Sequence, residues 1–380
     1  MKIAIVSPEF LPERGGIQTY SYEFARELGC RGHDVTVFTR AHAEGEMQGT
    51  PFHIEPVLQL RRRLDRGILR NQSFDVWHAM NAAYAWLALE TPRVFVTVHG
   101  NDFLWPYLPV GRLDLRERWR LPFGSNVDRW LGDKLTRALV RRALPRVGHV
   151  FTNSQFTKQT FLRHYPECTG KISAAMVGVS ENYFAAPRPP RPPGPPRLIT
   201  VCRLAEAHKN VDLVLRALAR LRDTCAFHYT VVGDGCLRPG LQQLTSDLGL
   251  TDRVEFTGLV ETETLHQLLR THDLFVLTTS ETPIAYEGFG LVYLEAAASG
   301  CPSLAARIGG AAEAVAEGVS GMFVNEVGVD SLEKKLRHFL SGEDRFDPGD
   351  CIAFARRFSW KAVVDHCLDH YGADTRRGDG

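Results

Sequence analysis

The chain has 380 residues, of which 44% are hydrophobic and 23% are charged, and its formal net charge is +1. This length exceeds what one hydrophobic core usually supports, so two domains are predicted, and the composition is that of a globular protein. The near-neutral balance of charge gives no support to a nucleic-acid-binding function.

The first half of the chain alternates apolar runs with helical patterns. In the first helical pattern Tyr20, Phe24 and Leu28 recur at the spacing of one helix face. Nearly continuous apolar runs indicate parallel strands that are covered on both faces. The strands predicted in this half are 2–6, 34–39, 74–80, 94–99 and 149–153.

A proline-rich segment, AAPRPPRPPGPPR at residues 185–197, separates the two halves. We interpret it as a linker, because proline lacks the N–H donor that a helix or an inner strand needs. The predicted domains are therefore residues 1–184 and residues 198–359.

The second half repeats the alternation of strands and helices. Its predicted strands are 197–202, 227–233, 253–258, 273–279 and 301–306. The pattern implies a doubly wound parallel sheet in each half, so the predicted fold class is α/β with two Rossmann-like domains. Ligands of such sheets bind beyond the carboxyl ends of the strands, and the expected site is a cleft that the two domains face.

Charge and cysteine usage bear on partners and location. Residues 1–184 carry 24 Lys and Arg against 18 Asp and Glu, whereas the rest carries 21 against 26. The basic first half suits an anionic membrane surface, although a solvated arginine-rich surface explains it equally well. The eight cysteines show no metal-binding spacing, and no segment suits a signal peptide or a membrane span. We expect a cytoplasmic protein with no metal or other cofactor, and leave open peripheral contact with the inner face of the cell membrane.

Two groups of residues near predicted strand ends suit a phosphate. Gly15 and Gly16 stand at the N-terminus of the first helix, where unpaired amides and the helix dipole attract anions. In the second half Arg203 follows a strand and Lys209 precedes a helix, so these two cations are able to neutralise a diphosphate. The alternative for the glycine pair is a plain turn, and the alternative for the two cations is that they are solvated surface charges.

The stretch YEGFGLVYLEA, residues 286–296, places two glutamates around a glycine-rich run. Because Gly288 and Gly290 weaken a helix interior, we expect the helix to begin near Leu291 and its first amides to face a ligand. The two carboxylates can then accept hydrogen bonds from hydroxyls at opposite ends of a nucleotide sugar, although exposed glutamates beside a buried helix would need no ligand. The residues of this stretch predicted to bind the nucleotide sugar, as the sugar donor, are Glu287, Gly288, Phe289, Gly290, Leu291, Val292 and Glu295.

These motifs resemble those of the family-four retaining glycosyltransferases, which have the GT-B fold. The similarity extends over nearly the whole chain, through SPEFLPERGGIQTYSYEFARELGCRGHDVTVFT, VTVHGNDF, TNSQFTK, VCRLAEAHKNVDLVLRA, VVGDG, FTGLV, SGCPSLAARIGGAAEAV and FSWKAVVDHCLDHY. The E-x7-E spacing of Glu287 and Glu295 is its most specific element. A last helix, at about residues 360–380, is similar to the one that crosses back onto the first domain in this fold.

The resemblance implies roles for single residues. Gly16 would lie against the donor phosphates, Arg203 and Lys209 would bind the diphosphate, and Glu295 would bind the ribose hydroxyls. Glu287 would hold the transferred sugar with the backbone of Phe289 and Gly290, and His99 would contact that sugar near the reacting carbon. The implied catalytic residues are thus His99, Glu287, Arg203 and Lys209. Ser180 stands where many relatives carry Asp, so it is assigned no role. The segment 280–288, which connects a predicted strand to the E-x7-E motif, looks longer than is usual in this family.

The implied activity is transfer of a hexose from a nucleotide sugar, with UDP-sugars favoured and GDP-sugars next. The implied acceptor is a glycan, a glycolipid or a lipid-linked glycan of cell-envelope polysaccharide or lipopolysaccharide assembly. The aromatic and arginine-rich residues 103–148 and the basic residues 61–70 suit such an anionic or lipid-linked acceptor. The chain contains no D-x-D sequence, which agrees with metal-independent transfer.

Other classes remain open. A small-molecule acceptor and a non-catalytic nucleotide-sugar-binding subunit are the alternatives to the function above, and this fold also includes sugar epimerases and phosphorylases. A nicotinamide dehydrogenase would carry GxGxxG after its first strand, where this chain has SPEFLPERGG.

Overall fold

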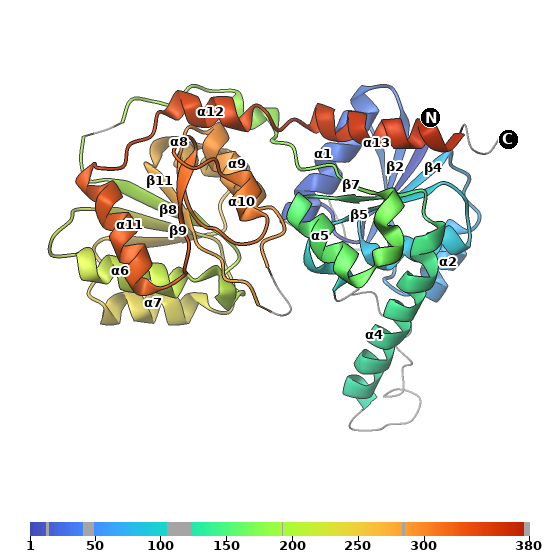
Figure 1. Cartoon of the computed structure of the whole chain (residues 1–380), viewed down its shortest axis with the longest axis horizontal. Helices are drawn as coiled ribbons and strands as arrows, with labels where there is room; N and C mark the ends of the chain where they lie inside the picture. Colours follow the sequence, from blue (N-terminus) through green and yellow to red (C-terminus); the bar gives the residue numbers. More distant parts are fainter. Residues whose placement is uncertain (13–14, 41–48, 105–123, 192, 283–285, 376–380) are drawn as a thin grey trace. The chain divides into compact units, whose positions relative to one another are not determined.

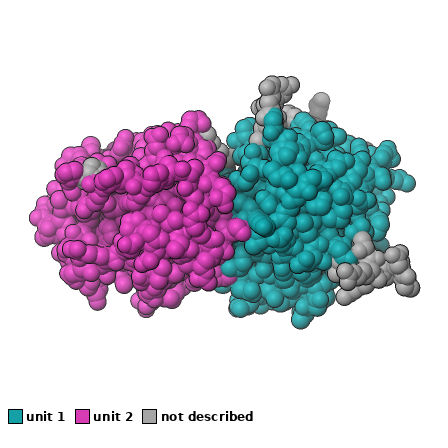
Figure 2. Space-filling view, turned by 90° about the horizontal axis from the view of Figure 1, so that it is seen from above, with its two compact units in different colours: residues 1–178, 360–380 teal, residues 179–359 magenta. Residues whose placement is uncertain are grey.

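The computed structural model describes residues 1–12, 15–40, 49–104, 124–191, 193–282 and 286–375. The chain forms two compact units, which Figure 2 shows in different colours. The first unit comprises Met1–Gly178 with Trp360–Gly380, and the second comprises Val179–Ser359. The chain therefore passes from one unit to the other after Gly178, whereas the sequence analysis placed the end of the first domain at residue 184.

The first unit contains a parallel sheet with helices on both faces (Figure 1). Its strands, in the order β3-β2-β1-β4-β5-β6-β7, are β1 (Lys2–Val6), β2 (Asp34–Arg40), β3 (His53–Leu58), β4 (Val76–Ala79), β5 (Val94–Val98), β6 (His149–Thr152) and β7 (Ile172–Ala174). Its helices are α1 (Gly16–Cys30), α2 (Arg62–Leu69), α4 (Gly124–Ala143), α5 (Gln155–His164) and α13 (Trp360–Thr375), with a 3-10 helix η1 (Ala82–Leu89).

All five strands predicted in the first half are confirmed, and the structure adds β3 and β7. These two lie at the edges of the sheet, and β3 is largely solvent-accessible and contains Pro56. Their sequences therefore lack the long apolar run that marks an inner parallel strand.

Helix α1 buries the face that its sequence predicts. Tyr20, Phe24 and Leu28 are all at most 1% exposed. A side chain at Gly29 would put its Cβ 2.1 Å from the backbone oxygen of Pro51, so only glycine allows this close approach. The C-terminal end of the helix therefore packs closely against the backbone at Pro51.

The C-terminal helix α13 belongs to the first unit, which confirms the return of the chain inferred from the resemblance. The hydroxyl of Tyr371 on α13 hydrogen-bonds to Nδ1 of His78 on β4, and Arg93 donates to the backbone oxygen of Tyr371 at 3.0 Å. Arg31, the C-cap residue of α1, forms an ion pair with Asp365 at 2.5 Å. Polar contacts thus fix this helix to both the sheet and α1.

The second unit contains a six-stranded sheet in which neighbouring strands are parallel. In the order β10-β9-β8-β11-β12-β13 its strands are β8 (Arg197–Val201), β9 (His228–Val232), β10 (Val254–Gly258), β11 (Leu274–Leu277), β12 (Ser303–Ala306) and β13 (Gly321–Val324). Its helices are α6 (Val211–Leu221), α7 (Arg238–Asp247), α8 (Thr262–Thr271), α9 (Leu291–Ala298), α10 (Ala311–Ala314), α11 (Val329–Ser341) and α12 (Pro348–Ala355). The five predicted strands are confirmed, and only the four-residue β13 was missed.

The proline-rich segment is attached to the second unit by two of its arginines. Arg188 donates hydrogen bonds to the backbone oxygens of Ser299, at 3.3 Å, and of His272. These carbonyls follow the last residues of α9 and α8, where the helix dipole favours a cation. Arg191 pairs with Asp273 at 3.0 Å. The segment therefore follows the surface of the second unit and is not a free tether.

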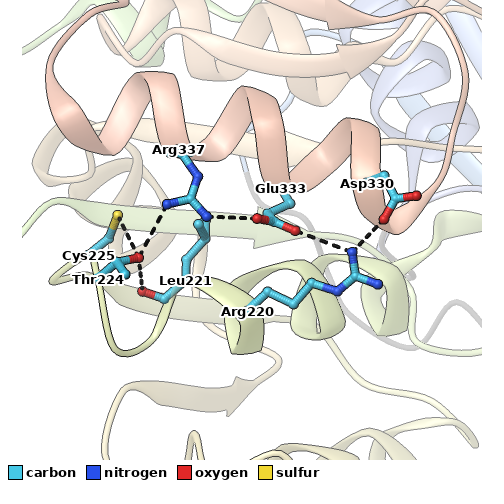
Figure 3. A network of polar contacts seen from close by, with 7 residues as sticks. All are labelled: Arg220, Leu221, Thr224, Cys225, Asp330, Glu333 and Arg337. Carbon is cyan, nitrogen blue, oxygen red and sulfur yellow. Dashed lines mark hydrogen bonds and ion pairs between the residues drawn. The ribbon is translucent and has the colours of Figure 1, made fainter.

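Helices α6 and α11 are joined by a network of charges on their outer side (Figure 3). Arg220 contacts Asp330 at 2.5 Å and Glu333 at 3.3 Å, and Glu333 also pairs with Arg337 at 2.7 Å. Because Asp330 is 91% exposed, water screens these pairs and they add little stability. The buried leucines beneath, such as Leu336, hold the two helices together.

The structure also bears on two expectations about cysteines and membranes. All eight cysteines are free thiols, of which four are buried, two are half-buried and two are exposed. Within the described part of the chain, no helix combines the length and the apolar character that crossing a membrane requires.

Candidate active site

The predicted donor residues of the second unit gather at the carboxyl ends of β8 and β11. These strands are neighbours at the centre of the sheet, where the strand order reverses. Such a switch point leaves a crevice beyond the strand ends in doubly wound sheets. Arg203 and Lys209 follow β8, and the loop after β11 leads to Glu287 and α9.

Lys209 and Glu287 form the central ion pair of this group. Nζ of Lys209 lies 2.7 Å from Oε2 of Glu287, and the two side chains are only 16% and 15% exposed. Burial lowers the pKa of Lys209, but the charge and hydrogen bond of Glu287 outweigh this effect, so its pKa is raised. Thr279 also donates to Oε2 at 3.5 Å. A charged lysine is thus held against the first glutamate of the E-x7-E motif.

Arg203 is much more exposed to solvent than this ion pair. Its side chain is 66% exposed, and its Nη2 is 3.4 Å from Oε1 of Glu206. The same carboxylate approaches Nζ of Lys209 to 3.9 Å and Nε2 of His208 to 3.7 Å. Burial lowers the pKa of His208, so this histidine is neutral at neutral pH. The two predicted diphosphate ligands therefore share Glu206 as a neighbour, which the sequence analysis did not single out.

Helix α9 begins at Leu291, as predicted. Its N-cap Gly290 has φ 86°, and a Cβ there would lie 2.4 Å from the ring of Tyr293, so glycine is required. The hydroxyl of Tyr293 donates to the backbone oxygen of Leu277 at 2.6 Å and ties the helix to β11. The first amides of a helix lack partners within it and can bind an anion or a hydroxyl.

The side chain of Phe289 points into the core. It is 2% exposed, and its ring centroid lies 5.9 Å from that of Phe358. Only the backbone of Phe289 is therefore suited to contact a donor, in agreement with the backbone role that the resemblance implies.

Glu295 lies one turn into α9 and has an unusual acidity. Burial raises the pKa of its carboxyl group to about 7, and a hydrogen bond from Tyr183 partly offsets this rise. At neutral pH the carboxyl group is therefore divided between its neutral and charged forms. A ligand that donates hydrogen bonds to it would favour the charged form.

A glycine pair braces the loop that carries Glu287. The amide of Gly310 donates to the backbone oxygen of Glu287 at 2.8 Å, and a Cβ on Gly310 would lie 2.0 Å from the backbone oxygen of Gly288. Gly309, at φ 62°, would bring a Cβ to 2.6 Å from the oxygen of Glu287. The sequence analysis gave this pair no role, although two adjacent glycines after a predicted strand signal a close backbone approach.

In the first unit, Gly15 and Gly16 lie at the start of α1 as predicted. Gly15 is its N-cap in an extended conformation, and a Cβ there would lie 2.4 Å from Oε1 of Gln18. A Cβ on Gly16 would meet no described atom within 4 Å. The open space at Gly16 is compatible with a ligand at the helix N-terminus.

His99 follows β5 in the same unit. Its ring lies edge-on to Tyr20 of α1, with 4.6 Å between the centroids. Burial lowers the pKa of His99 to about 3, so the imidazole is neutral, and its buried Nε2 has no hydrogen-bond partner among the described residues. Since buried polar nitrogens normally have partners, this atom is suited to a ligand hydroxyl.

The loop that carries His99 is fixed by Asp102, which the sequence analysis missed. Oδ1 of Asp102 accepts from the amide of His99 at 2.8 Å, and Oδ2 accepts from the amide of Ala82 at 3.0 Å. Burial raises the pKa of Asp102 to about 7 despite these hydrogen bonds. One carboxylate thus connects the loops that follow β4 and β5.

The two doubly wound parallel sheets define a GT-B architecture. The cations at the switch point of the second sheet, together with the E-x7-E motif at the start of α9, define a glycosyltransferase. Residues 14–183 match the family described as Glycosyltransferase Family 4, and residues 195–342 match Glycosyl transferases group 1. The chain belongs to the family-four glycosyltransferases, and it is an enzyme of the hexosyltransferase type.

Known proteins that resemble the chain cover almost all of it. It is 28% identical to the GDP-mannose-dependent alpha-(1-6)-phosphatidylinositol monomannoside mannosyltransferase of Mycolicibacterium smegmatis, over 98% of this chain and 95% of that protein. The solved structure of sucrose-phosphate synthase from Thermosynechococcus elongatus is similar with a TM-score of 0.76, at 18% identity over 98% of both chains. That of Anabaena Alr3699/HepE in complex with UDP-glucose has a TM-score of 0.72, at 19% identity over 98% of this chain and 100% of that one.

Proposed function

We propose that this enzyme transfers a hexose, with retention of anomeric configuration, from a nucleoside-diphosphate sugar to a glycolipid or lipid-linked glycan. The observation that carries the proposal is the ion pair of Lys209 and Glu287 beside the N-terminus of α9. It combines a cation for phosphate, a carboxylate for sugar hydroxyls and the first amides of a helix in one place. The E-x7-E family motif supports the same roles for these residues.

Two donors are supported by different relatives. The mycobacterial protein is named as GDP-mannose-dependent, and the Anabaena structure holds UDP-glucose. The sequence analysis favours UDP-sugars first, whereas the relative that matches at 28% identity supports GDP-mannose. We therefore propose that the donor is a hexose linked to GDP or to UDP. GDP-mannose is the first donor to assay, and UDP-glucose is the second.

In the proposed reaction the bond between the anomeric carbon and the diphosphate breaks, and the acceptor oxygen bonds to that carbon on the same face. The acceptor proton moves to the departing phosphate oxygen, so no enzyme nucleophile is required. Arg203, Lys209 and the first amides of α9 would stabilise the charge on the leaving diphosphate. Metal independence stays a prediction, which transfer in the presence of EDTA would test.

His99 would act in this reaction without a charge. Because the pKa of its imidazole is about 3, the ring is neutral and can only donate or accept a hydrogen bond near neutral pH. Its partnerless Nε2 suits a hydroxyl of the transferred sugar. Glu287 would hold another hydroxyl of that sugar while its own charge is balanced by Lys209.

The acceptor is proposed from the basic character of the first unit and from the lipid-linked acceptor named for the mycobacterial relative. On α2, Arg62 and Arg66 contact Glu90 at 3.5 and 2.8 Å, while Arg63 is exposed and Leu64 is 46% exposed. Exposed arginine beside exposed leucine suits an anionic membrane surface. Of residues 103–148, which the sequence analysis associated with the acceptor, 105–123 lie outside the described residues.

Transfer assays test the proposal directly. The purified chain is incubated with GDP-mannose or UDP-glucose and a phosphatidylinositol glycolipid, with and without EDTA, and proton NMR determines the anomeric configuration of the product. Retained configuration supports the proposal, and an inverted product overturns the mechanism. Binding of a nucleotide without any transfer, to this acceptor or to soluble glycans, would favour a non-catalytic binding subunit.

Membrane contact is tested separately by flotation with vesicles that contain anionic lipid. Arg63→Glu/Arg70→Glu should lose vesicle binding, and Arg216→Glu/Arg345→Glu, with the same charge change on the second unit, should retain it. Equal flotation of the two variants would remove the membrane part of the proposal and leave the donor site untouched.

A further inference from the structure

Glu206 places a carboxylate among the cations proposed to bind the donor diphosphate. Its Oε1 is 3.4 Å from Nη2 of Arg203, and its Oε2 is 3.9 Å from Nζ of Lys209. The residue directly precedes the 3-10 turn Ala207–Lys209, and its backbone oxygen accepts from the amide of Lys209 at 3.1 Å. The main chain thus keeps Glu206 close to the lysine whatever its side chain contacts.

The charges of this group cancel before any donor binds. Arg203 and Lys209 carry two positive charges, and Glu206 and Glu287 carry two negative charges within 4 Å of them. A diphosphate brings further negative charge, and like charges at such distances repel strongly when they are shielded from water. Favourable binding therefore requires that one of the two carboxylates leaves the cations.

Glu287 is the carboxylate that stays. Its contact with Lys209 is 2.7 Å, within the range of a hydrogen-bonded ion pair, and both side chains are largely buried. Its backbone oxygen is also held by the amide of Gly310 at 2.8 Å. Removing the carboxylate of Glu287 from this position would break a short ion pair between two largely buried side chains.

Glu206 is the carboxylate that can leave. Its side chain is 31% exposed, and its three ionic contacts, at 3.4 to 3.9 Å, are all longer than the 2.7 Å contact between Glu287 and Lys209. Its partner Arg203 is 66% exposed and therefore able to turn toward a ligand. His208, the third contact, is neutral and does not retain the carboxylate by charge.

We propose that Glu206 is a displaceable counter-ion of the diphosphate subsite. In the free enzyme it balances Arg203 and Lys209, and the donor diphosphate takes over its place on these cations. When the nucleoside diphosphate product leaves, the carboxylate returns, which weakens product binding and favours release. This inference rests on the proposed function of the donor site and adds a residue that tunes its affinity.

The test is isothermal titration calorimetry with GDP, UDP, GMP and UMP on the full chain. Glu206→Gln keeps the size of the side chain but removes its charge, and it should tighten binding of the diphosphate by about two- to tenfold. Binding of the monophosphate should change much less, because it lacks the second phosphate. Glu206→Ala should act in the same direction, which separates the loss of charge from any new contact of the amide.

Asp223→Asn is the matched control. It removes the same charge from an 84% exposed side chain just after the opposite end of α6, and it should leave nucleotide affinity unchanged. Unchanged or weaker binding of the diphosphate to Glu206→Gln, while the wild-type chain binds it, overturns the inference alone. Failure of the wild-type chain to bind either diphosphate overturns the donor site and the inference together.

Discussion

Nζ of Lys209 lies 2.7 Å from Oε2 of Glu287, although 78 residues separate them in the sequence. The lysine comes after β8 and the glutamate after β11, and these strands are neighbours in the sheet. The contact thus exists because the strand order places two distant loops side by side. It joins a residue proposed for phosphate binding to one proposed for sugar binding.

The first prediction concerns this pair. Lys209→Met leaves the largely buried carboxylate of Glu287 without its partner and should lower the free energy of unfolding by about 2–4 kcal/mol. Lys209→Met/Glu287→Met should recover much of that loss, because no unpaired charge remains. Thermal unfolding of both variants, with Lys334→Met on the exposed side of α11 as control, measures the effect. A double variant as unstable as the single one would contradict a strong coupling between the two charges.

Glu295 should make donor binding depend on pH. Burial raises the pKa of its carboxyl group to about 7, and hydroxyl donors of a bound ribose favour the charged form. Nucleotide affinity should therefore rise between pH 6 and pH 8 in the wild-type chain, and more steeply than in Glu295→Gln. Calorimetric titrations at both pH values make the comparison, and the variant corrects for titration of the nucleotide itself.

The carboxyl group of Glu295 should lower the stability of the fold as pH rises, whereas it raises nucleotide affinity. A carboxyl group whose pKa is higher in the folded chain than in the unfolded one stabilises the fold at low pH, and this contribution is lost as pH rises from about 4.5 to about 7. Glu295→Gln should therefore stabilise the chain relative to wild type at pH 8, by at most about 3 kcal/mol, and much less at pH 5. An equal difference at both pH values would show that the carboxyl group is not buried as the structure has it.

His99 should contribute to turnover as a neutral group. Its Nε2 is buried without a described partner, so His99→Ala should lower kcat by about 10²- to 10³-fold if that nitrogen contacts the sugar in the transition state. His99→Gln should retain part of the activity because its amide can still form a hydrogen bond. Steady-state kinetics measure both, with the exposed His164→Ala as control. Full activity of His99→Ala would remove His99 from the site.

Gly310 should be intolerant of any side chain. A Cβ there would lie 2.0 Å from the backbone oxygen of Gly288, so Gly310→Ala must displace the loop that carries Glu287. We expect nucleotide-sugar turnover to fall at least tenfold, in line with the sensitivity of such sites to a misplacement of about 1 Å. Gly240→Ala on α7, where a Cβ meets no described atom within 4 Å, is the matched control and should retain activity.

Buried and half-buried histidines should make the attachment of α13 sensitive to acid. Burial lowers the pKa of His78 and of His149 to about 3, and it lowers that of His366 on α13. Because the unfolded chain takes up protons on these groups below about pH 6.5, their contribution to stability is lost as pH falls from there toward 3.

A thermal-unfolding comparison at pH 7.5 and pH 5 measures this loss. His149→Gln, which removes one titrating group but can still bond to Ser173, should show a smaller decrease in Tm than the wild-type chain. His338→Gln on the exposed side of α11 should show the same decrease as wild type. If His149→Gln behaves like wild type, the half-buried imidazole of His149 does not account for the acid sensitivity.

Much of the fold could be predicted from local sequence patterns. Inner parallel strands are apolar on both faces, so β1, β2 and β4 to β6 produce runs that are visible without any structure. The edge strand β3 contains a proline and polar residues, and the edge strand β13 begins with a glycine and has an apolar run of only three residues, so neither stands out in the sequence. The start of α9 at Leu291 followed from Gly288 and Gly290, because glycine marks helix ends.

The sequence by itself determined the two-sheet architecture, the family and most of the candidate site residues, since these depend on periodicity and on motifs of neighbouring residues. Only the tertiary structure decided which of these residues are partners. The approach of Glu206 to Arg203, the support of Glu287 by Gly310 and the bond between His78 and Tyr371 all depend on how loops and helices pack at the sheets. Burial is likewise a property of the folded chain, and it alone keeps His99 neutral and raises the pKa of Glu295.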